Sequence, residues 1–237
     1  MAFSLSSKSR LTEYDLGRFQ GVTLFDRIAR ATCEAGCLPR KELYEAWEVA
    51  RRVRRVFRGG RVVDLAAGHG LLAQLLLILD DSSPTAVAVD TELPASAPKL
   101  HDALARSWPH LRSRVTFEAR SLDSMELHAD DVVVSSHACG GLTDLVIDRA
   151  IAARARVAVL PCCHAFKAND QSALSGWVDG ALAIDIMRVV KLEQHGYHVR
   201  THTIPADVTP KNRLLLASHR GHGCGLDGDS GNISPSH

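Results

Sequence analysis

The sequence predicts an α/β fold in which a doubly wound, mostly parallel sheet of seven strands is closed by an antiparallel C-terminal hairpin. From Arg61 onward, short β-branched runs alternate with helical patterns, which is typical of a parallel sheet. The runs are apolar throughout, as expected when helices cover both faces of a sheet. No helical pattern separates the last two runs, which favours an antiparallel pair there.

The first two expected helices precede the sheet. One covers Leu24–Glu34, and a stronger one follows Pro39, because its apolar positions recur at three- and four-residue spacing. The expected parallel strands are Arg61–Leu65, Thr85–Val89, Val115–Ala119, Asp131–Ser135 and Val157–Leu160. The helices between them are Leu71–Leu79, Pro98–Trp108 and Leu142–Ala153, and the closing hairpin is Tyr197–Ile204 with Asn212–Ser218.

Length and composition indicate one main domain. The chain has 237 residues, of which 46% are hydrophobic and 23% charged, as is ordinary for a globular protein. We expect residues 1–38 to form an N-terminal arm with a short helix, its first twenty residues loosely held. Residues 39–220 form the domain, and the Gly- and Ser-rich residues 221–237 a disordered tail.

Charge and cysteine usage narrow the function classes. The 28 Lys and Arg nearly balance the 27 Asp and Glu, so RNA binding would need a local patch. No apolar run reaches the roughly 20 residues of a membrane span, and Met1–Arg10 lacks an apolar signal core. The six cysteines are then expected to be reduced thiols in the cytoplasm.

Arginines form a strip on the polar face of the helix after Pro39. Two interpretations remain open for this strip: an ordinary solvated face, or a surface that contacts RNA. The strip consists of Arg51, Arg52, Arg55 and Arg58.

The sharpest motif is a strand that runs into a turn of small residues and then into a helix, over Val62–Gly70. Gly68 and Gly70 let the backbone approach a ligand where a Cβ would collide, and the helix start offers free N–H groups. Asp90 ends the next strand, about twenty residues after the glycines, where a carboxylate can accept both hydroxyls of a ribose.

Two cofactors fit this motif. Gly68, Gly70 and Ala73 satisfy the loose dinucleotide pattern, whereas Asp64 with the two glycines satisfies the D-x-x-x-G-x-G pattern of S-adenosylmethionine sites. Asp64 favours S-adenosylmethionine, because a carboxylate balances its cationic amino acid end and would repel a pyrophosphate. NAD or FAD, and a glycine turn without ligand, remain weaker alternatives. Leu122 follows the third strand, where it would flank the adenine; a plain polar loop fits nearly as well.

Cysteines and histidines follow the fourth and fifth strands, at the edge of the sheet where ligands bind in such folds. In the first interpretation they shape a substrate pocket, with His137 or His164 as general base. In the second they are structural, the thiols acting as small hydrophobic groups. The third is a zinc site, although adjacent cysteines suit one tetrahedral ion poorly, and we predict no metal. Its ligands would be Cys139, Cys162, Cys163 and His164.

These motifs together resemble one branch of the class I methyltransferases. The matching segments are His137–Gly140, Thr143–Asp144, Pro161–His164 and Thr209–Arg213, in register with Asp64–Gly70. That branch includes ribose methyltransferases acting on the acceptor stem of eukaryotic tRNA, and methyltransferase-like proteins. The resemblance covers about Lys41–Arg220 and implies dependence on S-adenosylmethionine. It says little about the substrate.

We therefore expect an S-adenosylmethionine-dependent methyltransferase. Asp64 would order the amino acid end of the cofactor, Asp90 would hold its ribose, and His137 would orient or deprotonate the acceptor. The acceptor stays open: an RNA ribose 2′-OH, a protein or a small molecule. The alternatives are an NAD(P)-dependent oxidoreductase and a non-catalytic RNA-binding protein on the same fold.

Overall fold

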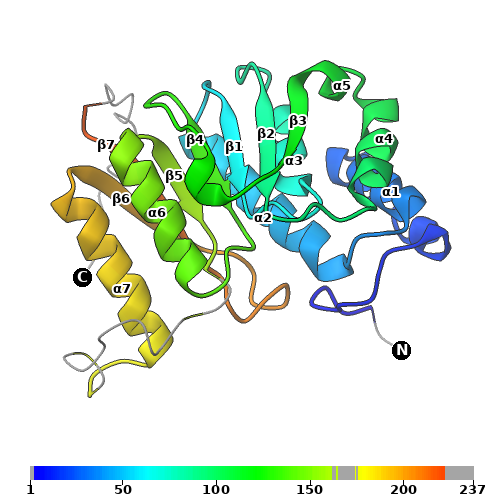
Figure 1. The fold of residues 1–237 in the computed structure, drawn as a ribbon. Helices are drawn as coiled ribbons and strands as arrows, with labels where there is room; N and C mark the ends of the chain where they lie inside the picture. Colours follow the sequence, from blue (N-terminus) through cyan, green and yellow to red (C-terminus); the bar gives the residue numbers. More distant parts are fainter. Residues whose placement is uncertain (1–2, 162–163, 165–173, 175, 222–237) are drawn as a thin grey trace, which may run out of the picture.

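A seven-stranded sheet organises the chain, as predicted (Figure 1). The computed structural model describes residues 3–161, 164, 174 and 176–221. The strands are β1 (Val62–Leu65), β2 (Ala86–Asp90), β3 (Val115–Ala119), β4 (Val132–Ser135), β5 (Arg156–Val159), β6 (Tyr197–Thr203) and β7 (Arg213–His219). Their spatial order is β3-β2-β1-β4-β5-β7-β6. Neighbours among β1 to β5 are parallel, and β7 is antiparallel to both β5 and β6.

Helices cover both faces of this sheet. The helical elements are η1 (Glu13–Arg18), α1 (Leu24–Ala35), α2 (Arg40–Val56), α3 (Leu71–Leu79), α4 (Ala97–Ser107), α5 (Leu111–Arg114), η2 (Leu122–Ser124), α6 (Gly141–Ala153) and α7 (Gly180–Gln194). Figure 1 shows α6 and α7 on one face and α2 and α3 on the other. Among the described residues, no helix has the combined length and apolarity that crossing a bilayer demands.

Alternate residues of the strands supply two separate cores. Val62 of β1 and Val132 of β4 pack in a cluster with α1 to α4, whereas Val63 and Val133 pack in a second cluster with α6 and α7. Because each strand buries both faces, every position of β1 and β4 is buried. This explains the uninterrupted apolar runs in the sequence.

The chain reverses direction across the sheet between β1 and β4. From β1 it winds outward through β2 to β3, then returns to place β4 on the other side of β1. Asp64 of β1 lies opposite Ala88 on one side and Val134 on the other. The carboxyl ends of β1 and β4 therefore flank a topological switch point, where α/β sheets of this kind bind ligands.

The N-terminal segment is held more firmly than the sequence suggested. Leu11 is fully buried and Phe19 is 4% exposed, both within the core around α1 and α2. The Leu11 N–H donates to the Leu38 carbonyl at 3.0 Å, and the Arg40 guanidinium lies over the Phe3 ring at 3.6 Å. The expected loose arm is therefore wrong over residues 3–20. Residues 222–237 of the expected tail lie outside the described residues.

Helix α7 has no counterpart among the expected elements. Asp179 begins it, because its side chain accepts the backbone N–H groups of Ala181 and Leu182 at 3.0 and 3.1 Å. The buried face of α7 carries Asp185 and Arg188 among its apolar residues. These charges interrupt the helical spacing of apolar positions that would otherwise reveal the helix.

Candidate functional site

Asp64 is a buried carboxyl group at the end of β1. It is 1% exposed, and its Oδ2 accepts the backbone N–H of Ala73 in the first turn of α3 at 3.2 Å. Burial raises the pKa of Asp64 from 3.8 to about 8, with Asp90 adding to the rise and the Ala73 N–H opposing it. A cation placed beside Asp64 would stabilise its charged form, so the position favours a positively charged ligand.

Asp90 contacts the turn between β1 and α3 from the neighbouring strand. Its Oδ2 accepts the backbone N–H of Gly68 at 2.9 Å, and the side chain is only partly buried. A carboxylate has about four acceptor positions, so this one bond leaves capacity for further donors such as ribose hydroxyls. Asp64 and Asp90 thus bracket the turn, one below it in the core and one at its rim.

The two glycines of the turn have different roles. A Cβ on Gly68, whose φ is +53°, would meet no atom within 4 Å, so the backbone borders open space here. A Cβ on Gly70, whose φ is +67°, would lie 2.6 Å from Phe117 Cε1 and 2.9 Å from the Ala88 Cβ. Gly70 therefore lets α3 pack against β2 and β3, and the predicted clearance for a ligand applies to Gly68 alone.

Leu122 supports the turn from η2. It is 4% exposed and packs in the core cluster that contains Ala66 and Val89. Its neighbours Ser121 and Asp123 are exposed. Leu122 was expected to flank the adenine of the cofactor, and its side chain is instead largely buried in this core.

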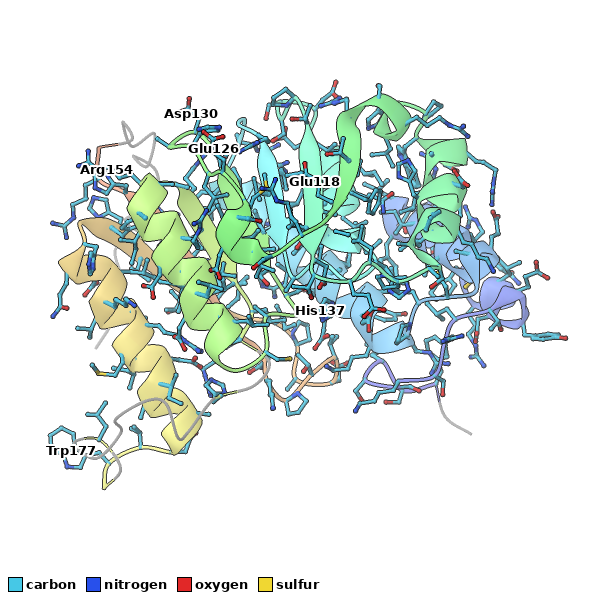
Figure 2. All side chains as sticks on the ribbon, in the orientation of Figure 1. Glu118, Glu126, Asp130, His137, Arg154 and Trp177 are labelled. Atoms are coloured by element: carbon cyan, nitrogen blue, oxygen red, sulfur yellow. The ribbon has the colours of Figure 1, made fainter. Side chains whose placement is uncertain are left out.

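His137 follows β4, at the carboxyl edge of the sheet (Figure 2). Its segment is fixed by two hydrogen bonds: the Ala138 N–H donates to Ser135 Oγ at 3.2 Å, and Thr143 Oγ1 donates to the Ala138 carbonyl at 2.6 Å. The ring is partly exposed. Since β4 neighbours β1, His137 lies beside the glycine turn at the switch point.

A second histidine, His69, lies at the same edge of the sheet. His69 stands between the two glycines, with Nε2 3.0 Å from Ser96 Oγ and Nδ1 3.9 Å from Glu42 Oε2. Burial lowers the pKa of His69; Glu42 opposes this, while His137 reinforces it. His69 and His137 therefore lie close enough for their charges to interact. His69 is part of the predicted turn, but nothing in the sequence marked Glu42 or Ser96.

His164 belongs to a charged network, and two members of this network, Asp185 and Arg213, also line a cavity of about 360 Å³. Its Nε2 lies 3.0 Å from Asp185 Oδ1, and its side chain is 4% exposed. Asp185 also accepts from Arg188 at 3.0 Å and from Arg213 at 2.7 Å. Arg188 in turn donates to both oxygens of Asp144, at 2.7 and 3.0 Å. These contacts favour a positioning role for His164 over the expected role of general base.

The cysteines leave the zinc interpretation undecided. Cys139 is exposed, and Cys162 and Cys163 lie outside the described residues. Within the part of the chain that is described, no three His, Cys, Asp or Glu side chains are grouped to hold a metal ion. The proposed zinc site needs the two undescribed cysteines, so it stays untested.

Comparison with known proteins identifies the domain. A family model described as a methyltransferase domain matches residues 41–168, which is more than half of the chain. No curated protein matches. An O-methyltransferase family protein from Burkholderia thailandensis has a similar structure at 18% identity and a TM-score of 0.50, covering 86% of this chain and 62% of its own.

A candidate O-methyltransferase from Nostoc punctiforme is also similar. Its identity is 17% and its TM-score 0.51, and the match covers 81% of this chain and 60% of the Nostoc protein. This chain thus spans about three fifths of the length of both neighbours, and the likeness concerns the fold. The match to the family model, together with this fold, shows that the chain belongs to the methyltransferase-domain family.

Proposed function

We propose that the protein is an S-adenosylmethionine-dependent methyltransferase that acts on a hydroxyl acceptor. The observation that carries this proposal is the pair of carboxyl groups on Asp64 and Asp90, which bracket an open turn at Gly68. The turn lies at the switch point of the sheet, where ligands bind in this class of fold.

The residues at this turn fit the cofactor. Asp64 suits the cationic amino acid end of the cofactor. Burial disfavours the ionised form of this carboxyl group, and a positive charge beside it would stabilise that form. Asp90 has acceptor capacity left for the ribose hydroxyls, and the open space at Gly68 admits a ligand against the backbone. S-adenosylmethionine, when bound, supplies a methyl group that its sulfonium has already activated.

The chain itself must position and deprotonate the acceptor. His137 lies at the carboxyl edge beside the turn, and a neutral imidazole nitrogen there can take the proton from a hydroxyl as it attacks. His69 stays predominantly neutral near pH 7 because burial lowers its pKa, so it adds little positive charge beside His137. The resemblance to the ribose methyltransferases makes an RNA 2′-OH the leading acceptor within this proposal.

Thermal-shift assays with S-adenosylhomocysteine and with NAD test the cofactor. We expect stabilisation by the first ligand only, because a ligand that binds the folded state raises its melting temperature. Stabilisation by NAD alone would replace the proposal with an oxidoreductase. Incubation with methyl-labelled S-adenosylmethionine and fractionated cell extract then tests the acceptor, and label in the RNA fraction is the expected result. Label confined to protein or to small molecules would overturn the RNA assignment.

A further inference from the structure

A polar groove lies between the C-terminal half of α2 and the edge strand β6, away from the glycine turn. Its volume is about 530 Å³. Its lining is basic and hydroxyl-bearing apart from one valine, and we name it the arginine groove. The lining residues are Arg52, Arg55, Val56, Arg200 and Thr201–Thr203.

The arginine groove carries an excess of positive charge. Arg52 forms an ion pair with Glu48, but Arg55 and Arg200 are exposed and pair with no acid in the described part of the chain. Burial lowers the pKa of His202, and the charges that lower it further are three arginines of the groove. Among the residues that the structure describes, no acidic side chain is among the charges that shift the pKa of His202. The arginine groove therefore gathers cationic charge on a chain whose total charge is near neutral.

The β6 side of the groove, residues 200–203, belongs to the half of that strand that runs toward the edge of the proposed active site. Strand β6 is antiparallel to β7, which is antiparallel to β5, so the carboxyl ends of β6 and β1 point the same way. Four strand spacings separate β6 from β1, or about 19 Å at roughly 4.8 Å each. Five or six nucleotides of a helical strand, at about 3.4 Å each, cover that distance.

We propose that the arginine groove binds the phosphate backbone of an RNA whose 2′-OH reaches the site beside His137. This inference rests on the proposed function, which supplies the preference for a hydroxyl acceptor. Arginine side chains match phosphate oxygens in two-pronged hydrogen bonds, and threonine hydroxyls add further donors. With a single valine among its lining residues, the groove offers little apolar surface to a lipid or an apolar peptide.

A charge-reversal pair tests the groove. The variant Arg55→Glu/Arg200→Glu is compared with Arg106→Glu/Arg112→Glu, which makes the same change of charge on α4 and α5 near the opposite edge of the sheet. Affinity for a fluorescently labelled RNA hairpin is measured by anisotropy over a range of salt concentrations. Both variants alter exposed residues, and their melting temperatures and affinity for S-adenosylhomocysteine check that the fold and the cofactor site are intact.

We expect the groove variant to lose at least about tenfold in RNA affinity and to lower the slope of log affinity against log salt by about two, one for each phosphate contact. The control variant should keep both values near those of the unaltered protein. Equal losses in both variants, or binding of polyglutamate as tight as that of RNA, would overturn the inference. An unaltered protein that binds S-adenosylhomocysteine but no RNA would overturn it too, while leaving the proposed cofactor intact. Failure to bind S-adenosylhomocysteine would instead count against the proposed function.

Discussion

The Nε2 atom of His164 lies 3.0 Å from Oδ1 of Asp185, and this contact joins the segment after β5 to α7 inside the protein. Arg188 and Arg213 share the same carboxylate, and Arg188 extends the network to Asp144 on α6. The network thus ties together α6, α7, β7 and the chain beyond β5. The network therefore fixes these four segments relative to one another.

Replacing Asp185 by Asn should destabilise the protein strongly. The change leaves the buried Arg188 without one of its two acidic partners and His164 and Arg213 without their shared one. Removing one member of a buried ionic group costs about 3–5 kcal/mol. Urea unfolding measures this loss. The matched control is Asp148→Asn, which breaks an exposed ion pair between Asp148 of α6 and Lys191 of α7 and should cost less than about 1 kcal/mol. Equal losses in the two variants would contradict the role given to the network.

Three of the five residues of this network stood out in the sequence. Asp144, His164 and Arg213 were singled out because they lie in motifs that resemble a methyltransferase branch, and the structure joins them through Asp185 and Arg188. Those two linking residues carried no motif. Asp185 and Arg188 also interrupt the helical spacing of apolar residues in α7. For this reason the sequence pattern indicated neither the helix nor the residues that link the network.

The strands of the sheet can be predicted from local sequence, whereas the contacts of the candidate site cannot. Strands such as β1 and β4 are buried on both faces, so every residue is apolar apart from Asp64 and Ser135, and the run is visible without any tertiary information. The site depends instead on contacts between distant segments, such as Glu42 with His69. No local pattern encodes such a contact.

The buried carboxyl of Asp64 predicts an unusual pH dependence of stability. Its pKa is about 8 in the folded protein against 3.8 ordinarily, so the folded state holds the extra proton between these values. Stability from this group is present below about pH 4 and is lost as pH rises through about 8. Asp64→Asn removes that loss. In thermal melts without ligand, the melting temperature of the Asp64→Asn variant should rise relative to that of the unaltered protein as the pH increases from about 5 to about 9.

Asp123→Asn serves as the control for Asp64, because Asp123 is exposed. Its melting curve should follow that of the unaltered protein across the range. A parallel fall for the Asp64→Asn variant would show that Asp64 is not the titrating group.

Alanine substitutions at the two glycines of the turn should have different effects: Gly70→Ala mainly on stability, and Gly68→Ala mainly on ligand binding. Alanine at either position costs about 1–2 kcal/mol, because both have a left-handed backbone. Gly70→Ala adds a collision with Phe117 and Ala88, so it should destabilise the protein considerably more than Gly68→Ala. Gly68→Ala places a methyl group in the open space instead, and should weaken S-adenosylhomocysteine binding. Urea unfolding and calorimetry measure the two effects; equal stability losses would refute the distinction.

His137 should matter for turnover and not for cofactor affinity. Loss of a general base typically lowers the rate by about 10²- to 10⁴-fold, and we expect His137→Gln to show a loss in that range. The affinity for S-adenosylhomocysteine should remain within about twofold of the original. A general base acts in the transition state and does not hold the cofactor, so its loss should lower the rate and leave cofactor binding unchanged. Rates are measured with labelled S-adenosylmethionine and the RNA fraction. His198→Gln, at an exposed position on β6, is the control. An undiminished rate in the His137→Gln variant would remove His137 from the mechanism.

The most direct measurement of the central claim is calorimetric titration of S-adenosylhomocysteine into the unaltered protein and into Asp90→Ala. Hydrogen bonds to a charged group contribute about 1.5–3 kcal/mol each, so we predict a loss of about ten- to a hundredfold in affinity. Glu92→Ala, two residues along the chain and exposed, should bind like the unaltered protein. Equal affinity of the Asp90→Ala and unaltered proteins, or no binding to either, would contradict the claim that the two acids around Gly68 form the cofactor site.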